Sequence, residues 1–492
     1  MSHALRELTR MNPNALDVER ATSAVATPRL AWLDGLRAIA ALAVCFFHIS
    51  PQILGSSMND AVLQHFSSGR YGVLLFFLVS GYIIPMSLER HGSLRRFWIG
   101  RMFRMYPAYL ISIAAMACLV AAGLRQWPEA ITSAPMTAIL GHASMMSEMV
   151  GIPGALVVHW TLGYELVFYL ITAGFFVYGL HRRSAIWAAG LAVLALIGGA
   201  ALPDGQYPFS GYGRLIAAGV LLAALVASCT AYVCGNGRAR QIAAITGIAT
   251  VSLAFLHGNA WHALDAKPSW ESILVLAVMF TGTVLYRANS RQISRRVAVS
   301  SCTVVLACLL IAPSLYLYER GSFLDGILAA PMTEWAGSTA AVIVTFGFAY
   351  ILRNRRTPRI LQWIGTISYS MYLFHIFVMY GIKHVGGDMS ARPMEQRMII
   401  VVVYCTAILF TSWASYRLVE LPGQRAGHRV LRYLERRWPV PSQGTTPTPL
   451  QETVVPAADP VTQLIPERAS SDVPGQLRRR RSERSAGLRR RE

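Results

Sequence analysis

Long blocks of apolar residues run through most of this 492-residue sequence and constrain its fold more than any other feature. Several blocks reach the roughly 20 residues that a helix needs to cross about 30 Å of hydrocarbon. In lipid, only helices and closed barrels satisfy every backbone polar group, and the alternating pattern of barrel strands is missing. Charged residues make up only 14% of the chain, against about 25% in soluble domains. We therefore predict an all-α integral membrane protein, a bundle of about 10–12 transmembrane helices.

The apolar blocks also locate the individual spans. Several blocks are short or interrupted, which leaves the count between ten and twelve. The first span begins at 38 or, alternatively, at 31. The predicted spans are 38–50, 71–88, 105–123, 156–179, 185–202, 214–234, 242–257, 271–286, 297–317, 336–352, 360–383 and 398–419.

The distribution of arginine predicts the orientation of the bundle. Every second connection between spans is rich in arginine, whereas the alternate connections hold fewer basic residues and most of the acidic ones. The five arginine-rich connections hold 17 arginines and are 89–104, 181–183, 236–241, 287–296 and 353–359. The positive-inside rule places these connections, and both termini, on the cytoplasmic side of a bacterial inner membrane.

Two polar tails flank the apolar blocks. We predict a polar cytoplasmic N-terminal tail over 1–29, a membrane-embedded domain over 30–423 and a basic, largely disordered cytoplasmic tail over 424–492. Within the second tail, 425–438 could form a basic helix lying on anionic lipid heads. The net charge of +20 gathers in the short connections and this tail, so we expect membrane lipids as partners and no nucleic acid.

Seven cysteines lie in or beside the apolar blocks, at no metal-ligand spacing. A disulfide framework would need cysteines in outer connections, where none lies. The sequence therefore predicts neither disulfides nor a metal site.

Ionisable residues inside a span are costly and mark function by default. Arg37 and His48 are eleven residues apart, about 16 Å of rise and nearly three whole turns, so they share one helical face. Asp34 precedes Arg37 by one turn and could pair with it. The alternative is a snorkelling arginine and a histidine that hydrogen-bonds between helices.

Two further motifs lie in the next two blocks. Ser80 belongs to the sequence FFLVSG at 76–81, where small residues permit either a site or simple helix contact. Arg101 and Arg104 are three residues apart and form neighbours on one face at a cytoplasmic mouth. Such a pair suits phosphate groups, although arginines that only set the topology are the alternative.

The last two motifs place polar groups well inside apolar segments. In WTLGYE at 160–165, Trp160 opens the segment, and Thr161 could bond to the buried carboxylate of Glu165. A structural ion pair is the alternative function of this glutamate. Tyr372 and His375 follow Ser368 at helical spacing in the sequence SYSMYLFH, and these three residues form a polar stripe that faces inward.

Taken in order, these motifs resemble the acyltransferase 3 family of integral-membrane acyltransferases. The resemblance runs from about Arg29 to Pro422. It comprises the Arg37–His48 spacing and the FFxxSG, RxxRxxP, WTLxxE and SYSMYLFH elements. The resemblance implies a membrane acyltransferase domain in its stand-alone form, without an SGNH domain. An alternative from another class is a glycan or lipid transporter or flippase, although no duplicated halves are visible.

The resemblance also implies the chemistry. An acyl group, most commonly acetyl, would pass from cytoplasmic acyl-CoA, used as a substrate rather than a bound cofactor, to a hydroxyl of a glycan, glycolipid or other acceptor. A small secondary metabolite such as a macrolide is the alternative acceptor. Arg37 and His48 would be essential, Glu165 a further site residue, and Arg101 and Arg104 would lie at the coenzyme A entrance.

The residues themselves suggest a division of roles. His48 could remove the proton of the acceptor hydroxyl or hold the acyl group transiently. Glu165 would orient or charge-balance His48, and Arg37 would hold coenzyme A or the acceptor. These roles require Arg37, His48 and Glu165 to converge on one polar cavity within the bilayer.

Overall fold

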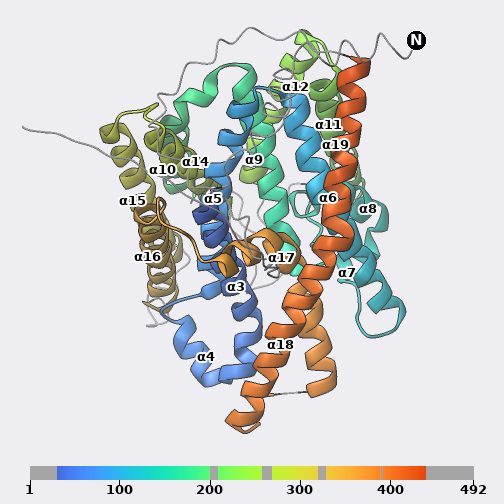
Figure 1. Cartoon of the computed structure of the whole chain (residues 1–492), viewed down its shortest axis with the longest axis vertical. Helices are drawn as coiled ribbons and strands as arrows, with labels where there is room; N and C mark the ends of the chain where they lie inside the picture. The colour runs from blue at the N-terminus through green and yellow to red at the C-terminus, as the bar shows by residue number, and fades with distance from the viewer. Residues whose placement is uncertain are drawn as a thin grey trace, which may run out of the picture. The chain divides into compact units, whose positions relative to one another are not determined.

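The computed structural model describes residues 30–199, 209–256, 269–319, 329–387, 389–390 and 392–438. All of them lie in one compact unit, Met1–Pro439. Every regular element in these ranges is helical, and they contain no strand (Figure 1). The predicted N-terminal tail at 1–29 and residues 439–492 of the predicted tail at 424–492 lie outside the described residues.

The helices follow the apolar blocks, with short 3₁₀ turns between some of them. Their bounds are α3 Ala31–Leu54, α4 Ser56–Leu63, α5 Ser68–His91, α6 Leu94–Ala121, α7 Glu129–Ser133, α8 Pro135–Ala143, η1 Ser147–Val150, η2 Val157–His159, α9 Trp160–Val177, η3 Leu180–Arg183, α10 Ser184–Gly198, α11 Tyr212–Cys234, α12 Gly237–Ala249, α13 Val251–Leu256, α14 Ser269–Asn289, α15 Arg295–Glu319, α16 Ala329–Ile351, α17 Arg359–Gly386, α18 Met394–Ser415, η5 Tyr416–Glu420 and α19 Leu421–Arg437.

The prediction of an all-α integral membrane protein is confirmed. Among the described residues, nine helices are long and apolar enough to cross a membrane by length and composition. The described part of the predicted span 242–257 and the predicted spans 336–352 and 360–383 are largely helical but are not among the nine. The first of these is divided at Thr250 into α12 and α13. The orientation of the termini stays a prediction.

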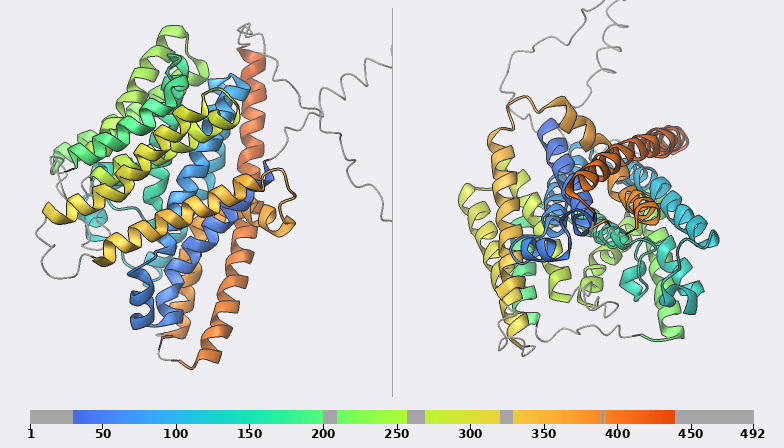
Figure 2. Two further views of the ribbon diagram at one scale, coloured as in Figure 1. Left: turned by 90° about the vertical axis from the view of Figure 1, so that its left-hand side faces the viewer. Right: turned by 90° about the horizontal axis from the view of Figure 1, so that it is seen from below.

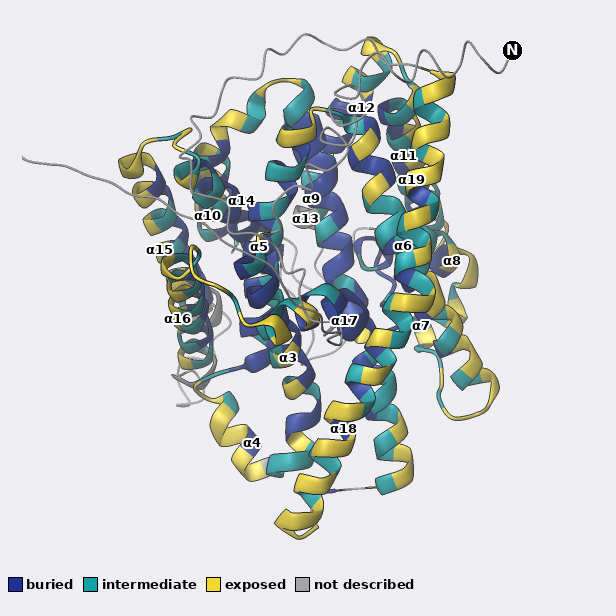
Figure 3. Ribbon diagram, in the orientation of Figure 1, coloured by how far each residue is buried: buried dark blue, intermediate teal, exposed yellow. Residues whose placement is uncertain are grey.

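Four helices form the centre of the bundle: α3 packs against α5 and α17, and α5 packs against α14. Figure 3 shows buried residues along α5, α9 and α14, whereas α4 and α18 are largely exposed. Glycines lie where the backbones of two helices come closest together. A Cβ on Gly81 of α5 would collide with the Met279 carbonyl of α14, and one on Gly282 would collide with the Leu78 carbonyl. Small residues at crossing points are how membrane helices pack closely.

Helices α3 and α17 run side by side in the same direction. Gly365 near the start of α17 lies against the backbone of Asp34, near the start of α3. Further along both helices, the rings of His48 and His375 are in contact. Two parallel helices begin on the same side of a membrane, as the alternation of arginine-rich connections requires.

The arginine-rich segment 89–104 is mostly helix, which corrects its assignment to a connection. Helix α6 begins at Leu94, and the Ser93 hydroxyl accepts a hydrogen bond from the backbone N–H of Arg96. The positive-inside rule counts charges near a membrane face whatever their secondary structure, so it does not locate the start of a helix. The arginines of α6 therefore hold fixed positions on its faces.

Residues 425–437 are helical as predicted, and one side of that helix packs along α6 while most of its other residues are exposed. A π turn, Tyr416–Glu420, joins α18 to α19, so the predicted boundary between 423 and 424 falls inside a continuous helical stretch (Figures 1 and 2). Gly423 and Gly427 lie against Phe103 of α6. The buried Arg95 donates to the carbonyls of Leu434 and Trp438 and fixes the end of α19.

The Gly81–Met279 contact predicts a specific loss of stability. In Gly81→Ala, the new methyl group would force α5 away from the α14 backbone, so we expect a lower Tm in detergent and less monodisperse protein. Overpacking of this kind costs about 1–3 kcal/mol. Gly190→Ala is the matched control, because nothing lies within 4 Å of a Cβ built there. Equal thermal stability of the two variants would contradict the prediction.

Candidate active site

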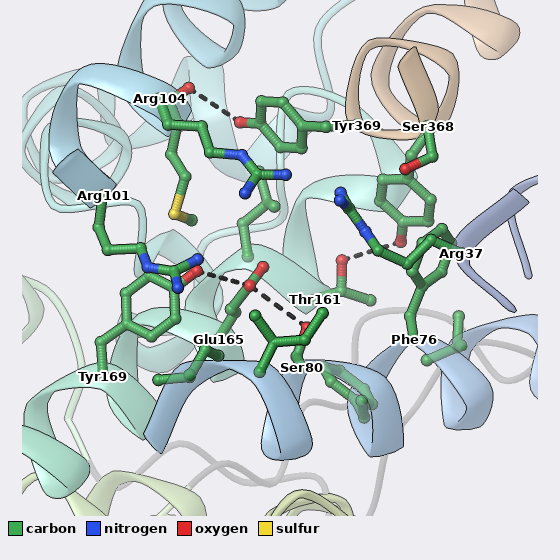
Figure 4. Close-up of a pocket in the computed structure, with 17 residues that line it drawn as sticks. Arg37, Phe76, Ser80, Arg101, Arg104, Thr161, Glu165, Tyr169, Ser368 and Tyr369 are labelled. Carbon is green, nitrogen blue, oxygen red and sulfur yellow. Dashed lines mark hydrogen bonds between the residues drawn. The ribbon is translucent and has the colours of Figure 1, made fainter. Parts of the chain in front are cut away.

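A polar cavity lies among α3, α5, α6, α9 and α17 and contains about 760 Å³ of empty space, including its open mouth (Figure 4). Each of these helices contributes at least one polar side chain to the wall, and apolar residues fill the rest. The cavity is lined by Arg37, Val73, Phe76, Phe77, Ser80, Ile83, Ile84, Arg101, Arg104, Met105, Thr161, Leu162, Glu165, Tyr169, Ser368, Tyr369 and Tyr372.

Six of the ten predicted site residues line this cavity. They come from five helices, so the sequence motifs that lie far apart meet in space. The six are Arg37, Ser80, Arg101, Arg104, Glu165 and Tyr372. Asp34, His48, Trp160 and His375 are not among the lining residues.

Glu165 lies on the α9 side of the cavity and is held by two hydroxyl groups. The Tyr169 hydroxyl donates to Glu165 Oε1 at 2.6 Å, and the Ser80 hydroxyl lies 3.4 Å from the same oxygen (Figure 4). The predicted bond from Thr161 is not made: its hydroxyl donates to Tyr372 Oη at 2.9 Å and lies 3.1 Å from Val158 O. Carboxylate oxygens accept such bonds readily, so α5 and α9 are tied together at this point.

Arg37 faces the cavity from α3. Four charges act on its guanidinium: Arg104 repels it, and Asp34, Glu420 and Glu165 attract it. Asp34 is buried one turn before Arg37, as the helical spacing predicts, and lies outside the cavity wall. Arg37 thus shares the cavity with three other ionisable side chains, Arg101, Arg104 and Glu165, and Asp34 attracts it from outside the cavity wall.

Glu420, which closes the last predicted span, was not among the ten predicted site residues but lies against one of them. It is 1% exposed, at the end of the π turn, and its Oε1 lies 3.8 Å from Arg104 Nε. Ser370 and Gln424 donate to the same carboxylate at 3.2 Å and 3.1 Å. The sequence places this glutamate at the end of the last span, where its isolation in an apolar segment was the available signal. A π turn often marks a functional position in a helix.

Arg101 reaches the cavity beside aromatic rings. Its Cζ lies 5.4 Å from the centre of the Tyr169 ring and 5.7 Å from that of Phe97. A guanidinium at this distance from a ring face gains about 0.5–1 kcal/mol at exposed sites. Tyr169 therefore contacts a positive group with its ring and a negative group, Glu165, with its hydroxyl.

Aromatic side chains close the end of the cavity farthest from Arg101 and Arg104. Phe76 and Tyr372 meet edge to face with ring centres 5.7 Å apart, and the Tyr372 hydroxyl donates to Val158 O at 3.1 Å. Trp160 lies behind this wall, edge-on to Phe77 and Tyr164 at 6.0 Å and 5.8 Å. Trp160 supports the lining rather than contributing to it.

His48 and His375 lie beyond this aromatic end. The centroids of their rings are 5.1 Å apart, and the His375 ring is 6.2 Å from that of Tyr372. His48 is partly buried on α3, and His375 is fully buried on α17. Arg37 and Glu165 therefore share the cavity, while His48 pairs with a second histidine one helical turn past Tyr372.

Comparison with known proteins identifies the family. The model of the acyltransferase domain of acyltransferase 3 proteins matches residues 30–417. The chain belongs to this family. The resemblance of the five sequence motifs is thereby confirmed, and the protein is an acyltransferase.

The relatives of this acyltransferase differ in length, and the name of one of them states an acceptor. It is 25% identical to acyltransferase MdmB of Streptomyces mycarofaciens, over 86% of this chain and 96% of that protein. It is 24% identical to peptidoglycan O-acetyltransferase OatA of Listeria monocytogenes, over 80% of this chain and 56% of OatA, so it spans about half of that relative. It is 32% identical to nodulation protein 10 of Rhizobium leguminosarum bv. viciae, over 28% of this chain and 41% of that protein. No solved structure matches it.

Because Glu420 pairs with Arg104, neutralising this glutamate should destabilise the protein. In Glu420→Gln, the arginines of the cavity lose a buried counter-charge, so we expect a lower Tm in detergent and a loss of roughly 1–3 kcal/mol. Glu435→Gln is the matched control, because its pair with Arg96 has side chains 42% and 50% exposed and such pairs contribute about 0–1 kcal/mol. The assignment is wrong if both variants unfold at the same temperature as the wild type.

Proposed function

We propose that this acyltransferase moves an acyl group, most simply acetyl, from cytoplasmic acyl-CoA to a hydroxyl of a cell-surface or exported glycan or glycoconjugate. Its site of action would be a bacterial inner membrane. The observation that carries the proposal is the cavity in which Arg37, Arg101 and Arg104 face Glu165 inside an apolar bundle.

Acyl-CoA is proposed as the donor because Arg37, Arg101 and Arg104 can bind its phosphate groups. Coenzyme A carries phosphate groups, and guanidinium groups bind phosphate with paired, charge-assisted hydrogen bonds. Arg101 and Arg104 lie one turn apart on α6, near the end of the bundle that the positive-inside rule assigns to the cytoplasm, where acyl-CoA is made. Tyr169 and Met105 would line the path of the less polar pantetheine arm.

The acceptor has two candidates. OatA is named for peptidoglycan, an exported glycan, which favours a glycan hydroxyl. The match to MdmB covers 96% of that protein, whose name gives no acceptor. A small secondary metabolite such as a macrolide is the second candidate, as the family resemblance implies. Both acceptors offer a hydroxyl, so the same chemistry serves either one.

The transfer needs a group that takes a proton. The acceptor oxygen would attack the thioester carbonyl carbon, the carbon–sulfur bond would break, and the thiolate would leave. A base takes the hydroxyl proton in the transition state, which contributes about 10²–10⁴-fold to the rate. His48 is the proposed base, with Arg37 holding the donor and Glu165 balancing the charge of the arginines.

Inside-out membrane vesicles that contain the chain test this function. With [¹⁴C]acetyl-CoA outside, label should become covalently attached to a glycan or lipid-linked fraction, and mass spectrometry should find one added acetyl group per modified hydroxyl. Vesicles without the chain are the control. Uptake of a glycan or lipid without covalent labelling would favour a transporter and refute the proposal.

Arg104→Ala should weaken donor binding specifically. Losing charge-assisted hydrogen bonds of about 1.5–3 kcal/mol raises the KM for acetyl-CoA roughly 10- to 100-fold. Arg96→Ala, on an exposed position of the same helix, should leave the KM unchanged. A normal KM in Arg104→Ala would exclude this arginine from the donor site.

A further inference from the structure

The second histidine of the pair lies behind the first. His375 is 0% exposed, whereas His48 is partly buried, and the two rings are tilted by 45° to each other. A substrate therefore cannot contact His375 directly. Any role of His375 in the chemistry would have to act through the His48 ring.

The hydrogen bonds of His375 determine which of its nitrogens carries the proton. Its Nδ1 lies 3.1 Å from the Met371 carbonyl oxygen, one turn earlier on α17. A carbonyl oxygen only accepts hydrogen bonds, so Nδ1 is the protonated nitrogen and Nε2 is an acceptor. This Nε2 is buried and has no hydrogen-bond partner among the described residues. An unsatisfied buried acceptor is costly, so a hydrogen-bond donor is expected beside it.

His142, a second buried histidine, makes the same Nδ1 hydrogen bond but also has a partner at Nε2. His142 Nδ1 bonds to the Ala138 carbonyl, also four residues earlier, at 2.8 Å. Its Nε2, however, accepts the backbone N–H of Ala155 at 2.9 Å. The acceptor of His142 is satisfied by the backbone, and the corresponding acceptor of His375, beside His48, is not.

The neighbouring helices hold the two rings in register. Gly365 allows α17 to lie directly on the α3 backbone, and the Tyr404 hydroxyl of α18 donates to the Cys45 carbonyl at 3.0 Å, one turn before His48. A catalytic base is commonly oriented by a third group that bonds to its far nitrogen. The geometry provides such a group in His375.

We propose that His375 is the positioning residue of His48: its Nε2 accepts a hydrogen bond from one ring nitrogen of His48 and stabilises the imidazolium. That imidazolium forms when the other nitrogen of His48 takes the proton of the acceptor hydroxyl, as the oxygen bonds to the acyl carbon. The proton then passes to the departing coenzyme A thiolate. This inference rests on the proposed function and adds a second histidine to it.

Two substitutions separate the two nitrogens of His375. In His375→Asn, the side-chain amide can replace Nδ1 at the Met371 carbonyl but offers nothing at the position of Nε2. In His375→Gln, the amide oxygen can reach the position of Nε2 and accept the bond from His48. His142→Gln is the matched control, because His142 has the same Nδ1 bond and lies outside the cavity wall.

The assay uses [¹⁴C]acetyl-CoA and inside-out vesicles with two acceptors, the endogenous hydroxyl acceptor and added hydroxylamine. Hydroxylamine attacks without first losing a proton, so it does not need the base. We expect His375→Asn to lower kcat for the hydroxyl acceptor by about 10- to 100-fold, part of the gain from general base catalysis. The KM for acetyl-CoA and the rate with hydroxylamine should stay near those of the wild type, and His375→Gln should recover part of the loss.

Three results would overturn the inference. They are an equal loss with both acceptors, equal activity of His375→Asn and His375→Gln, and wild-type rates in both variants. The amount of folded protein, measured by size-exclusion chromatography, corrects every rate. A wild type that transfers label to neither acceptor would instead refute the proposed function, so the two failures are distinguishable.

Discussion

The compensation of arginine charge inside a lipid-solvated bundle is the constraint on which the site depends. An ionised side chain within a membrane span is expensive unless it finds a partner or water. Arg37 and Arg104 repel each other across the cavity, and Glu165 and Glu420 offset that repulsion. Since these four residues come from α3, α6, α9 and the π turn, the helices can pack stably only where the charges meet. Stability and function therefore require the same arrangement.

The C-terminal helix completes this arrangement. The π turn at Tyr416–Glu420 directs the Glu420 carboxylate toward Arg104, and α19 continues from the turn along α6. Arg95 fixes the far end of α19 through two carbonyl groups. One face of α6 thus carries arginines that open into the cavity, and another carries an arginine that secures α19. The basic sequence at 425–438 is consequently part of the structure that positions the site.

Much of the site could be predicted from the spacing of residues within one helix. The wrong predictions share one cause, because each depended on contacts between helices. Helical spacing correctly grouped Arg101 with Arg104 and placed Asp34 beside Arg37, because such relations depend on one helix alone. The expectation that His48 joins Arg37 and Glu165 in one cavity depended on what fills the space between helices. Phe76 and Tyr372 line the cavity, and His48 lies against His375 instead. The start of α6 and the partner of Thr161 were likewise set by neighbouring helices, and a single sequence does not reveal them.

Access to the cavity tests the central claim most directly. Ser80→Cys and Ile83→Cys place a thiol at two partly exposed positions of the α5 wall, in a background without the exposed native cysteines Cys118, Cys234 and Cys405. A membrane-impermeant maleimide should label both thiols in inside-out vesicles but not in right-side-out vesicles, and acetyl-CoA should slow the labelling. Labelling from the opposite face, or labelling that acetyl-CoA leaves unchanged, would contradict a cytoplasm-facing donor site lined by Arg37, Arg104 and Glu165.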